Sequence, residues 1–371
     1  MLWLSACAWL QGGDSNLEPA SALVKFTPRV ELRQAWWHDT GADIEDKHIL
    51  LRPAVRDDAI YTVDRAGQVT AYNATDGKRR WRVKLKREVS TGLGFAGDLL
   101  FVGTQKGQVI ALAAQTGATA WEARVPSEVL SPPVSDGKTV VVQTGDGKIS
   151  ALAAADGKTL WLQEHNEPSL SLRGTAAPTL IGDKAVVGFA NGKLAALKLG
   201  DGATSWETTI SDARGRDEIE RLIDVDAAPV TIDGNVYTGA YQGKWVALAS
   251  DTGALNWARE ISSYHASAHD ARNIYLVDAN GIVYALDARS GATVWRQDKL
   301  RARRLTAPAV FGDYIVVGDF EGYVHYLRKE DGDFAARERV GSDAIKVQPV
   351  VRENLIYILD QGADLTALTL K

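Results

Sequence analysis

Hydrophobic and polar positions alternate along this chain in short runs that are separated by glycine-containing turns. One unit contains the runs Pro133–Val134, Thr139–Gln143, Lys148–Ala153 and Leu160–Gln163. Runs this short, bounded by Asp-Gly and Gly-Asp-Gly sequences, are typical of strands joined by tight hairpins. The pattern therefore predicts a unit of four short antiparallel strands.

The third run of the unit, Gly147-Lys-Ile-Ser-Ala-Leu152, is repeated most faithfully along the chain. Several copies are apolar on both faces, as expected for a sheet that lies between two neighbouring sheets. The other copies span 67–72, 107–112, 192–197, 243–248, 281–286 and 322–327, and residues 362–368 form a further copy with one inserted residue.

A tryptophan follows the last turn of the unit, four residues after its glycine, and a proline marks the start. Trp161 follows Gly157 in this way, and Pro133 lies 28 residues before Trp161. The tryptophan recurs at Trp81, Trp121, Trp206, Trp257 and Trp295, and the same proline spacing is found for Pro53, Pro178 and Pro229. Four-stranded units that recur about every 40 residues are typical of β-propellers.

The units number eight, and the last one is incomplete. It begins at Pro349, so its tryptophan would fall beyond Lys371. The segment Arg33–His38 contains tryptophans but no preceding unit, and we expect it to complete the last blade with Trp37 in the tryptophan position. The sequence thus predicts an all-β, eight-bladed propeller of four-stranded antiparallel blades, closed by the N-terminal strand so that no sheet edge stays open.

Composition limits the classes of function. The 371 residues include 42 basic and 47 acidic ones, for a net charge of -5, and the basic residues are dispersed, so we expect no nucleic-acid partner. Cys7 is the single cysteine, which excludes an internal disulfide, a CxxC metal site and a haem attachment motif. No apolar stretch is long enough to span a bilayer.

The N-terminal sequence Leu4-Ser-Ala-Cys7 resembles the lipobox of bacterial lipoproteins, in which the cysteine is acylated. The alternative is a chance cysteine in a frayed terminus, because the residues before Leu4 are too few for a complete signal peptide. We expect residues 1–27 to comprise a remnant of a lipoprotein signal, the lipidated Cys7 and a flexible tether, and residues 28–371 to form the propeller.

Two neighbouring units are followed by long connectors, which run for 17 residues after Trp161 and 23 after Trp206, against 10 to 13 elsewhere. Connections between blades emerge on one face, so these two insertions are expected side by side. Leu170 and Leu172 alternate with serines in the first, and Asp224 and Asp226 end the second. The insertions either form a protein-binding patch or pack over the mouth of the ring; spacing alone leaves both open.

The repeats over residues 35–371, the segments Pro168-Ser-Leu-Ser-Leu-Arg-Gly174 and Ile219-Glu-Arg-Leu-Ile-Asp-Val-Asp226, and the Leu-Ser-Ala-Cys start together resemble the BamB family, lipoproteins of the outer-membrane β-barrel assembly (BAM) machinery. The resemblance implies a non-enzymatic scaffold, lipid-anchored on the periplasmic face of the outer membrane. It implies docking on the POTRA domains of BamA through Leu170, Leu172, Arg173, Asp224 and Asp226. Unfolded outer-membrane proteins are further expected partners. Whether the two aspartates pair with Arg173 or with BamA stays open.

The alternative is an enzyme, because quinoprotein dehydrogenases that bind pyrroloquinoline quinone and calcium share the repeat. A single cysteine cannot form the vicinal disulfide that such enzymes often carry, and no carboxylate cluster suits calcium. His265 and His269 form an HxxxH sequence, but in a connector and strand their rings would not converge on zinc. We therefore expect no catalytic residues, no cofactor and no metal.

Overall fold

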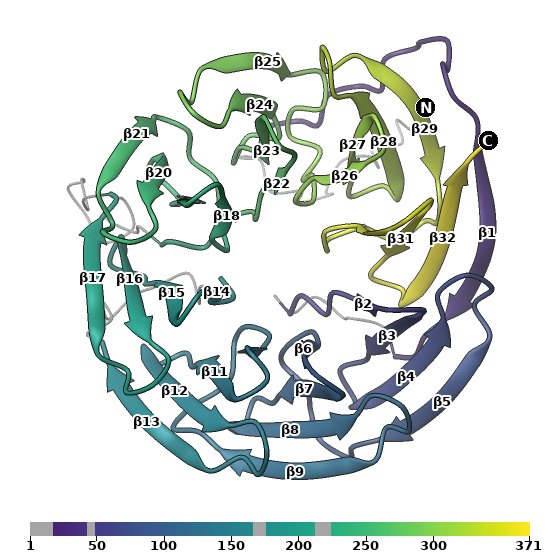
Figure 1. Ribbon diagram of the computed structural model, residues 1–371. Helices are drawn as coiled ribbons and strands as arrows, with labels where there is room; N and C mark the ends of the chain where they lie inside the picture. The colour runs from purple at the N-terminus through teal and green to yellow at the C-terminus, as the bar shows by residue number, and fades with distance from the viewer. Residues whose placement is uncertain (1–17, 43–48, 166–175, 212–223) are drawn as a thin grey trace, which may run out of the picture.

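The computed structural model describes residues 18–42, 49–165, 176–211 and 224–371, and in these ranges every regular element is a strand. The strands form eight antiparallel sheets of four, arranged as the blades of a ring (Figure 1). The predicted eight-bladed propeller is confirmed.

Each of blades 1 to 7 uses four consecutive strands, ordered from the centre of the ring outwards. Blades 1 to 4 comprise β2 (Ala54–Arg56), β3 (Ala59–Val63), β4 (Gln68–Asn73) and β5 (Arg79–Lys84); β6 (Gly94–Ala96), β7 (Leu99–Gly103), β8 (Gln108–Ala113) and β9 (Thr119–Arg124); β10 (Val134–Ser135), β11 (Thr139–Gln143), β12 (Lys148–Ala153) and β13 (Thr159–Glu164); β14 (Thr179–Ile181), β15 (Lys184–Gly188), β16 (Lys193–Lys198) and β17 (Thr204–Thr209).

Blades 5 to 7 comprise β18 (Val230–Ile232), β19 (Asn235–Gly239), β20 (Trp245–Ala249) and β21 (Leu255–Arg259); β22 (Ala268–His269), β23 (Asn273–Val277), β24 (Val283–Asp287) and β25 (Thr293–Gln297); β26 (Ala309–Phe311), β27 (Tyr314–Gly318), β28 (Tyr323–Arg328) and β29 (Phe334–Arg339). Blade 8 comprises β30 (Val350–Arg352), β31 (Leu355–Leu359), β32 (Asp364–Leu370) and β1 (Leu32–Asp39). The two middle strands of each blade are almost wholly buried between neighbouring blades, which explains their apolar residues on both faces.

The N-terminal strand closes the ring, as predicted. β1 pairs antiparallel with β32, the C-terminal strand, and becomes the outer strand of blade 8. The expected position of the tryptophan is wrong by one residue. Trp36 is the buried one and lies opposite Ala367, the register that Trp161 has with Ala151, whereas Trp37 is 47% exposed.

Each tryptophan of the outer strand holds its blade to the next. The Trp161 ring packs on Gly157's counterpart in blade 4, Gly202, where a Cβ would lie 2.7 Å from the ring. Its indole Nε1 donates a hydrogen bond to the Leu199 carbonyl at 2.8 Å. Gly202 has φ +74°, a conformation that glycine adopts without strain. Equivalent bonds join Trp36 to Ala74, Trp81 to Ala114, Trp121 to Ala154, Trp206 to Ser250, Trp257 to Ala288 and Trp295 to Lys329.

Blade 7 carries Ala336 in the tryptophan position, and the reason lies in blade 8. A tryptophan there would face the turn between the last two strands of blade 8, but the chain ends at that place, between β32 and β1. Val30, Leu32 and Leu370 pack beside Ala336 instead. The missing tryptophan thus coincides with the missing turn.

Candidate docking surface

The residues that flank the two long insertions converge on one residue, Phe189, in the turn between β15 and β16. His165, at the start of the first insertion, stacks on Phe189 with ring centroids 4.1 Å apart. At the end of the second insertion, the Val225 amide donates a hydrogen bond to the Phe189 carbonyl at 3.4 Å. The expectation that the two insertions leave the propeller side by side therefore holds for their flanks.

Val225 fixes the direction in which the second insertion rejoins the ring. A Cβ on Gly188 would lie 2.8 Å from the Val225 side chain, so the two pack closely. Val129 packs on Gly103 and Ile345 on Gly318 in the same manner, each from the connector that enters the following blade. Val225 therefore occupies a position that belongs to the repeat, and Asp224 and Asp226 lie on either side of it.

The two aspartates differ in exposure. Asp224 is 3% exposed, and its carbonyl accepts a hydrogen bond from the Tyr241 amide at 2.9 Å. Asp226 is half-buried. Asp226 is the more accessible of the two to a partner.

Blades 4 and 5 differ from the other six blades at the turn between their second and third strands. At this position the amide of the turn residue donates to the carbonyl four residues later in all eight blades. The side chain is Asp or Thr in six blades, namely Asp64, Thr104, Thr144, Asp278, Asp319 and Asp360, but Phe189 and Ala240 in blades 4 and 5. Sequence reasoning did not single out Phe189 and Ala240. The aligned repeats nevertheless show that an apolar residue replaces the polar turn residue in these two blades.

His165 is held neutral at this surface. Burial lowers its pKa, and the opposing attraction of Glu207, 4.0 Å away, does not offset the burial. Glu207 is itself paired with Lys193 at 2.6 Å. His165 therefore acts as an aromatic ring at neutral pH, and the neighbouring ion pair supplies the charge.

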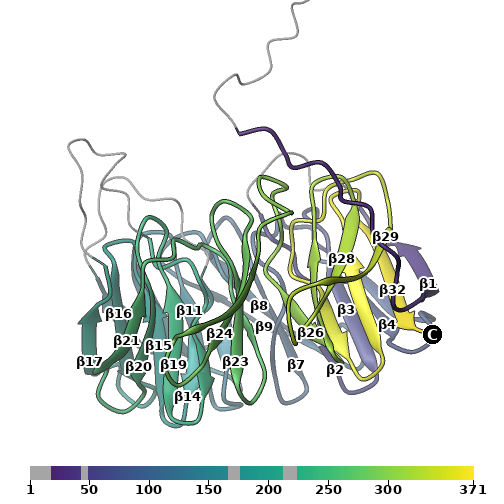
Figure 2. The same ribbon diagram turned by 90° about the horizontal axis from the view of Figure 1, so that it is seen from above.

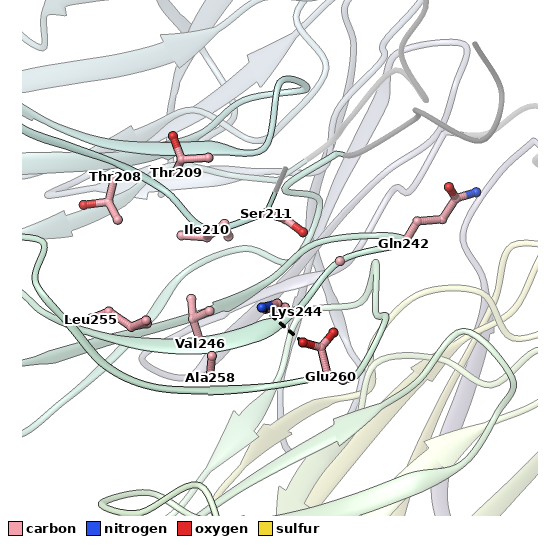
Figure 3. Close-up of a pocket in the computed structure, with 11 residues that line it drawn as sticks. Thr208, Thr209, Ile210, Ser211, Gln242, Lys244, Val246, Leu255, Ala258 and Glu260 are labelled. Atoms are coloured by element: carbon pink, nitrogen blue, oxygen red, sulfur yellow. Dashed lines mark ion pairs between the residues drawn. The ribbon is translucent and has the colours of Figure 1, made fainter. Parts of the chain in front are cut away.

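A cavity of 240 Å³ opens between blades 4 and 5, next to the start of the second insertion. Ile210 and Ser211 line one side, and Lys244 pairs with Glu260 at 3.1 Å on the other (Figure 3). Apolar side chains, the buried Val246 and the exposed Leu255 among them, also line it. The cavity offers a place for one partner side chain with both polar and apolar groups.

Several predicted residues have no structural test. Leu170, Leu172, Arg173 and Cys7 lie outside the described residues. His265 lies in a connector, with its ring tilted against Tyr264 at a centroid distance of 4.2 Å, and His269 is exposed in β22. Across the described ranges, no group of three or more His, Cys, Asp or Glu side chains could hold a metal ion. The same ranges contain no helix that is long and apolar enough to cross a membrane.

Comparisons with known proteins agree with the propeller fold. A family model described as outer membrane protein assembly factor BamB matches residues 65–297 and 279–371. A BamB of Pseudomonas aeruginosa is 46% identical over 95% of this chain and 93% of its own length. The crystal structure of BamB from Moraxella catarrhalis has a TM-score of 0.83 and 28% identity, covering 91% of this chain and all of that one.

Quinoprotein enzymes resemble the chain more distantly. The quinohemoprotein alcohol dehydrogenase of Comamonas testosteroni has a TM-score of 0.73 but only 12% identity, covering 91% of this chain and 76% of that one, so the likeness shows the fold alone. The family model and the relatives cover nearly the whole propeller. The chain belongs to the BamB family of outer membrane protein assembly factors.

Proposed function

We propose that this protein is a non-enzymatic scaffold for outer-membrane protein assembly, which docks through its two long insertions on the POTRA domains of BamA. The observation that carries the proposal is the convergence of both insertion flanks on Phe189. The first insertion thereby leaves the ring beside the place where the second one rejoins it, which supports a shared docking surface. The names of the chain's relatives support a role in assembly.

The proposed contact combines apolar anchors with charged residues that orient them. Leu170 and Leu172 supply the anchors, because buried apolar side chains at the centre of an interface contribute most of its binding energy. Arg173, Asp224 and Asp226 supply charge, which sets register and specificity more than affinity. The half-buried Asp226 is the carboxylate suited to a cross-partner pair, while the buried Asp224 holds the segment.

The location follows from the same proposal. Cys7 carries the lipid anchor, and the propeller faces the periplasm at the outer membrane, in contact with the rest of the BAM complex. Unfolded outer-membrane proteins are further partners. The net charge of -5 gives no attraction to nucleic acid.

Affinity purification from detergent-solubilised envelopes tests the proposal. The wild-type chain is expected to retain BamA, and the double variant Leu172→Ala with Asp226→Ala is expected to retain much less. Leu160→Ala is the matched control, because Leu160 is 51% exposed on β13, outside both insertions. Failure of the wild-type chain to retain BamA would remove the basis of the proposal.

A further inference from the structure

Residues 18–31, which we call the N-terminal strap, lie extended across blades 6 and 7. The Ser21 amide donates to the Arg301 carbonyl at 3.0 Å, and the Arg29 amide donates to the Ala335 carbonyl at 2.7 Å. Arg301 lies in the connector between blades 6 and 7, on the face of the ring from which the insertions also leave. The strap therefore runs from that face down to β1, as Figure 2 shows.

A buried charged cluster lies beneath the strap in blade 7. Arg303 is 3% exposed, and its Nε donates to Asp319 Oδ2 at 2.7 Å. His325 Nε2 lies 2.8 Å from the same oxygen. Arg337, opposite His325 in the sheet, donates from Nε to His325 Nδ1 at 3.1 Å, which assigns a neutral ring that donates from Nε2.

The cluster is peculiar to blade 7. Asp319 belongs to the repeat, but His325 does not, and both are fully buried. The residues equivalent to His325 in the other blades, by strand register, are Thr70, Ile110, Ser150, Ala195, Val246, Tyr284 and Thr366. Burying charged groups costs free energy. A buried charged cluster that occurs in one blade is therefore expected to have a role at that place.

The cluster binds the strap directly. Arg303 Nη1 donates to the Ser21 carbonyl at 3.0 Å, and Arg337 Nη1 donates to the Val24 carbonyl at 3.0 Å. Both arginines thus contact backbone oxygens of the strap, so these two contacts do not require particular side chains at Ser21 and Val24. Together they fix the strap to the ring at two places, Ser21 and Val24.

One aromatic side chain of the strap completes the contact. Phe26 stacks on Phe334 with ring centroids 5.3 Å apart, and the Arg337 guanidinium lies 5.0 Å from the Phe26 ring. Phe334 begins β29, at a position where the other outer strands carry exposed residues such as Thr119 and Thr159. In blade 7 the phenylalanine is only 7% exposed, because the strap covers it.

We propose that this cluster is a docking site for the N-terminal strap that fixes where the chain leaves the ring and so limits the reach of the lipid anchor. The second part rests on the proposed anchor at Cys7. Glu18 lies only 11 positions after Cys7, whereas Leu32 lies 25 positions after it. At ~3.6 Å per extended residue, the docked strap limits the reach to ~40 Å, and a released strap would extend it to ~90 Å.

The docked strap therefore holds the insertion-bearing face near the membrane that carries the anchor. Because residue 18 leaves the ring on the same face as the insertions, the docked strap places the start of the tether on that face. If the strap were released, the ring could rotate freely at the end of a long flexible tether.

Hydrogen exchange on the full chain tests the docking. Phe26→Ala is expected to accelerate exchange of the Ser21 and Arg29 amides about tenfold, while the amides of β1 stay as in the wild type, because Phe26 lies outside the blades. Arg337→Gln is expected to act in the same direction. Lys25→Ala is the control, because Lys25 is exposed within the strap. Unchanged exchange in Phe26→Ala would overturn the docking.

Energy transfer on vesicle-bound protein tests the reach. A fluorophore on Lys106→Cys, in an exposed turn on the insertion-bearing face, would report distance to a membrane dye. Phe26→Ala is expected to lower the transfer, as is an insertion of about ten Gly-Ser residues after Gly13. Unchanged transfer in Phe26→Ala would overturn the limit on reach. A wild-type chain that fails to bind vesicles would refute the anchor and the limit together, while faster exchange in Phe26→Ala would still establish the docking.

Discussion

His165 stacks on Phe189 with ring centroids 4.1 Å apart, and this contact joins the first insertion to the blade from which the second departs. Phe189 stands where most blades carry a polar turn residue. Its aromatic ring and its carbonyl serve the flanks of both insertions, so one substitution in the repeat organises the proposed docking surface.

Replacing Phe189 should damage the docking surface more than the fold alone explains. Phe189→Ala removes the stack on His165 and leaves a cavity, at a cost of about 3 kcal/mol in the free energy of unfolding. Binding to the POTRA domains should weaken as well. Ile110→Ala in blade 2 should cost a similar amount of stability because Ile110 is buried, yet leave binding unchanged. Equal binding by both variants would show that Phe189 has no role at the surface.

The tryptophans should contribute to stability in proportion to their burial between blades. Trp161→Ala removes a ring that packs on Gly202 and a hydrogen bond to Leu199, and should cost about 3–5 kcal/mol. Leu160→Ala, one residue away on the exposed side of β13, should change stability by less than about 0.5 kcal/mol. Chemical denaturation of both variants would measure the difference.

Closure of the ring should depend on Trp36 and not on its neighbour. Trp36 donates to the Ala74 carbonyl of blade 1 at 3.0 Å and packs on Gly77, whereas Trp37 is exposed. Trp36→Ala should therefore lower the midpoint of thermal unfolding by several degrees. Trp37→Ala should leave it nearly unchanged, and a larger shift for Trp37 would contradict the register of β1.

Asp360 should make stability fall as pH rises. Burial, and the nearby Asp364 and Asp343, raise the pKa of Asp360 from 3.8 to about 6. A raised pKa favours the protonated form in the folded state, so its contribution is complete below pH 3.8 and is lost as pH rises through 6. Asp360→Asn keeps an acceptor for the Asp364 amide, and should be about 2 kcal/mol more stable than wild type at pH 8. Urea denaturation between about pH 4 and pH 8 should show the two proteins converging toward acid.

The constant spacing between proline, glycine and tryptophan made the blade count and the ring closure predictable, because each unit is a local meander whose turns require particular residues. The N-terminal strand had no second copy with which to align, and the choice between Trp36 and Trp37 depends on a long-range register with Ala367. That register follows from the pairing of the chain's two ends and from no local signal.

The candidate surface was only partly predictable. The lengths of the connectors located the insertions, because the repeat unit has a constant length and the two longer connectors therefore stand out. The role of Phe189 depends on contacts from two distant segments, and the burial of Asp224 depends on the packing of Val225 against Gly188. The strap of residues 18–31 lacks any repeat, so its docking on Arg303 and Arg337 could not be predicted.

Titration of the purified protein with purified POTRA domains of BamA tests the central claim most directly. The proposed docking predicts saturable binding, weakened at least about tenfold by Leu172→Ala with Asp226→Ala, which corresponds to about 1.4 kcal/mol. Leu160→Ala, on the exposed side of β13, should bind as the wild type does. Equal affinity of the double variant and the wild type, or no binding by the wild type, would contradict the assignment of the docking surface to the two insertions.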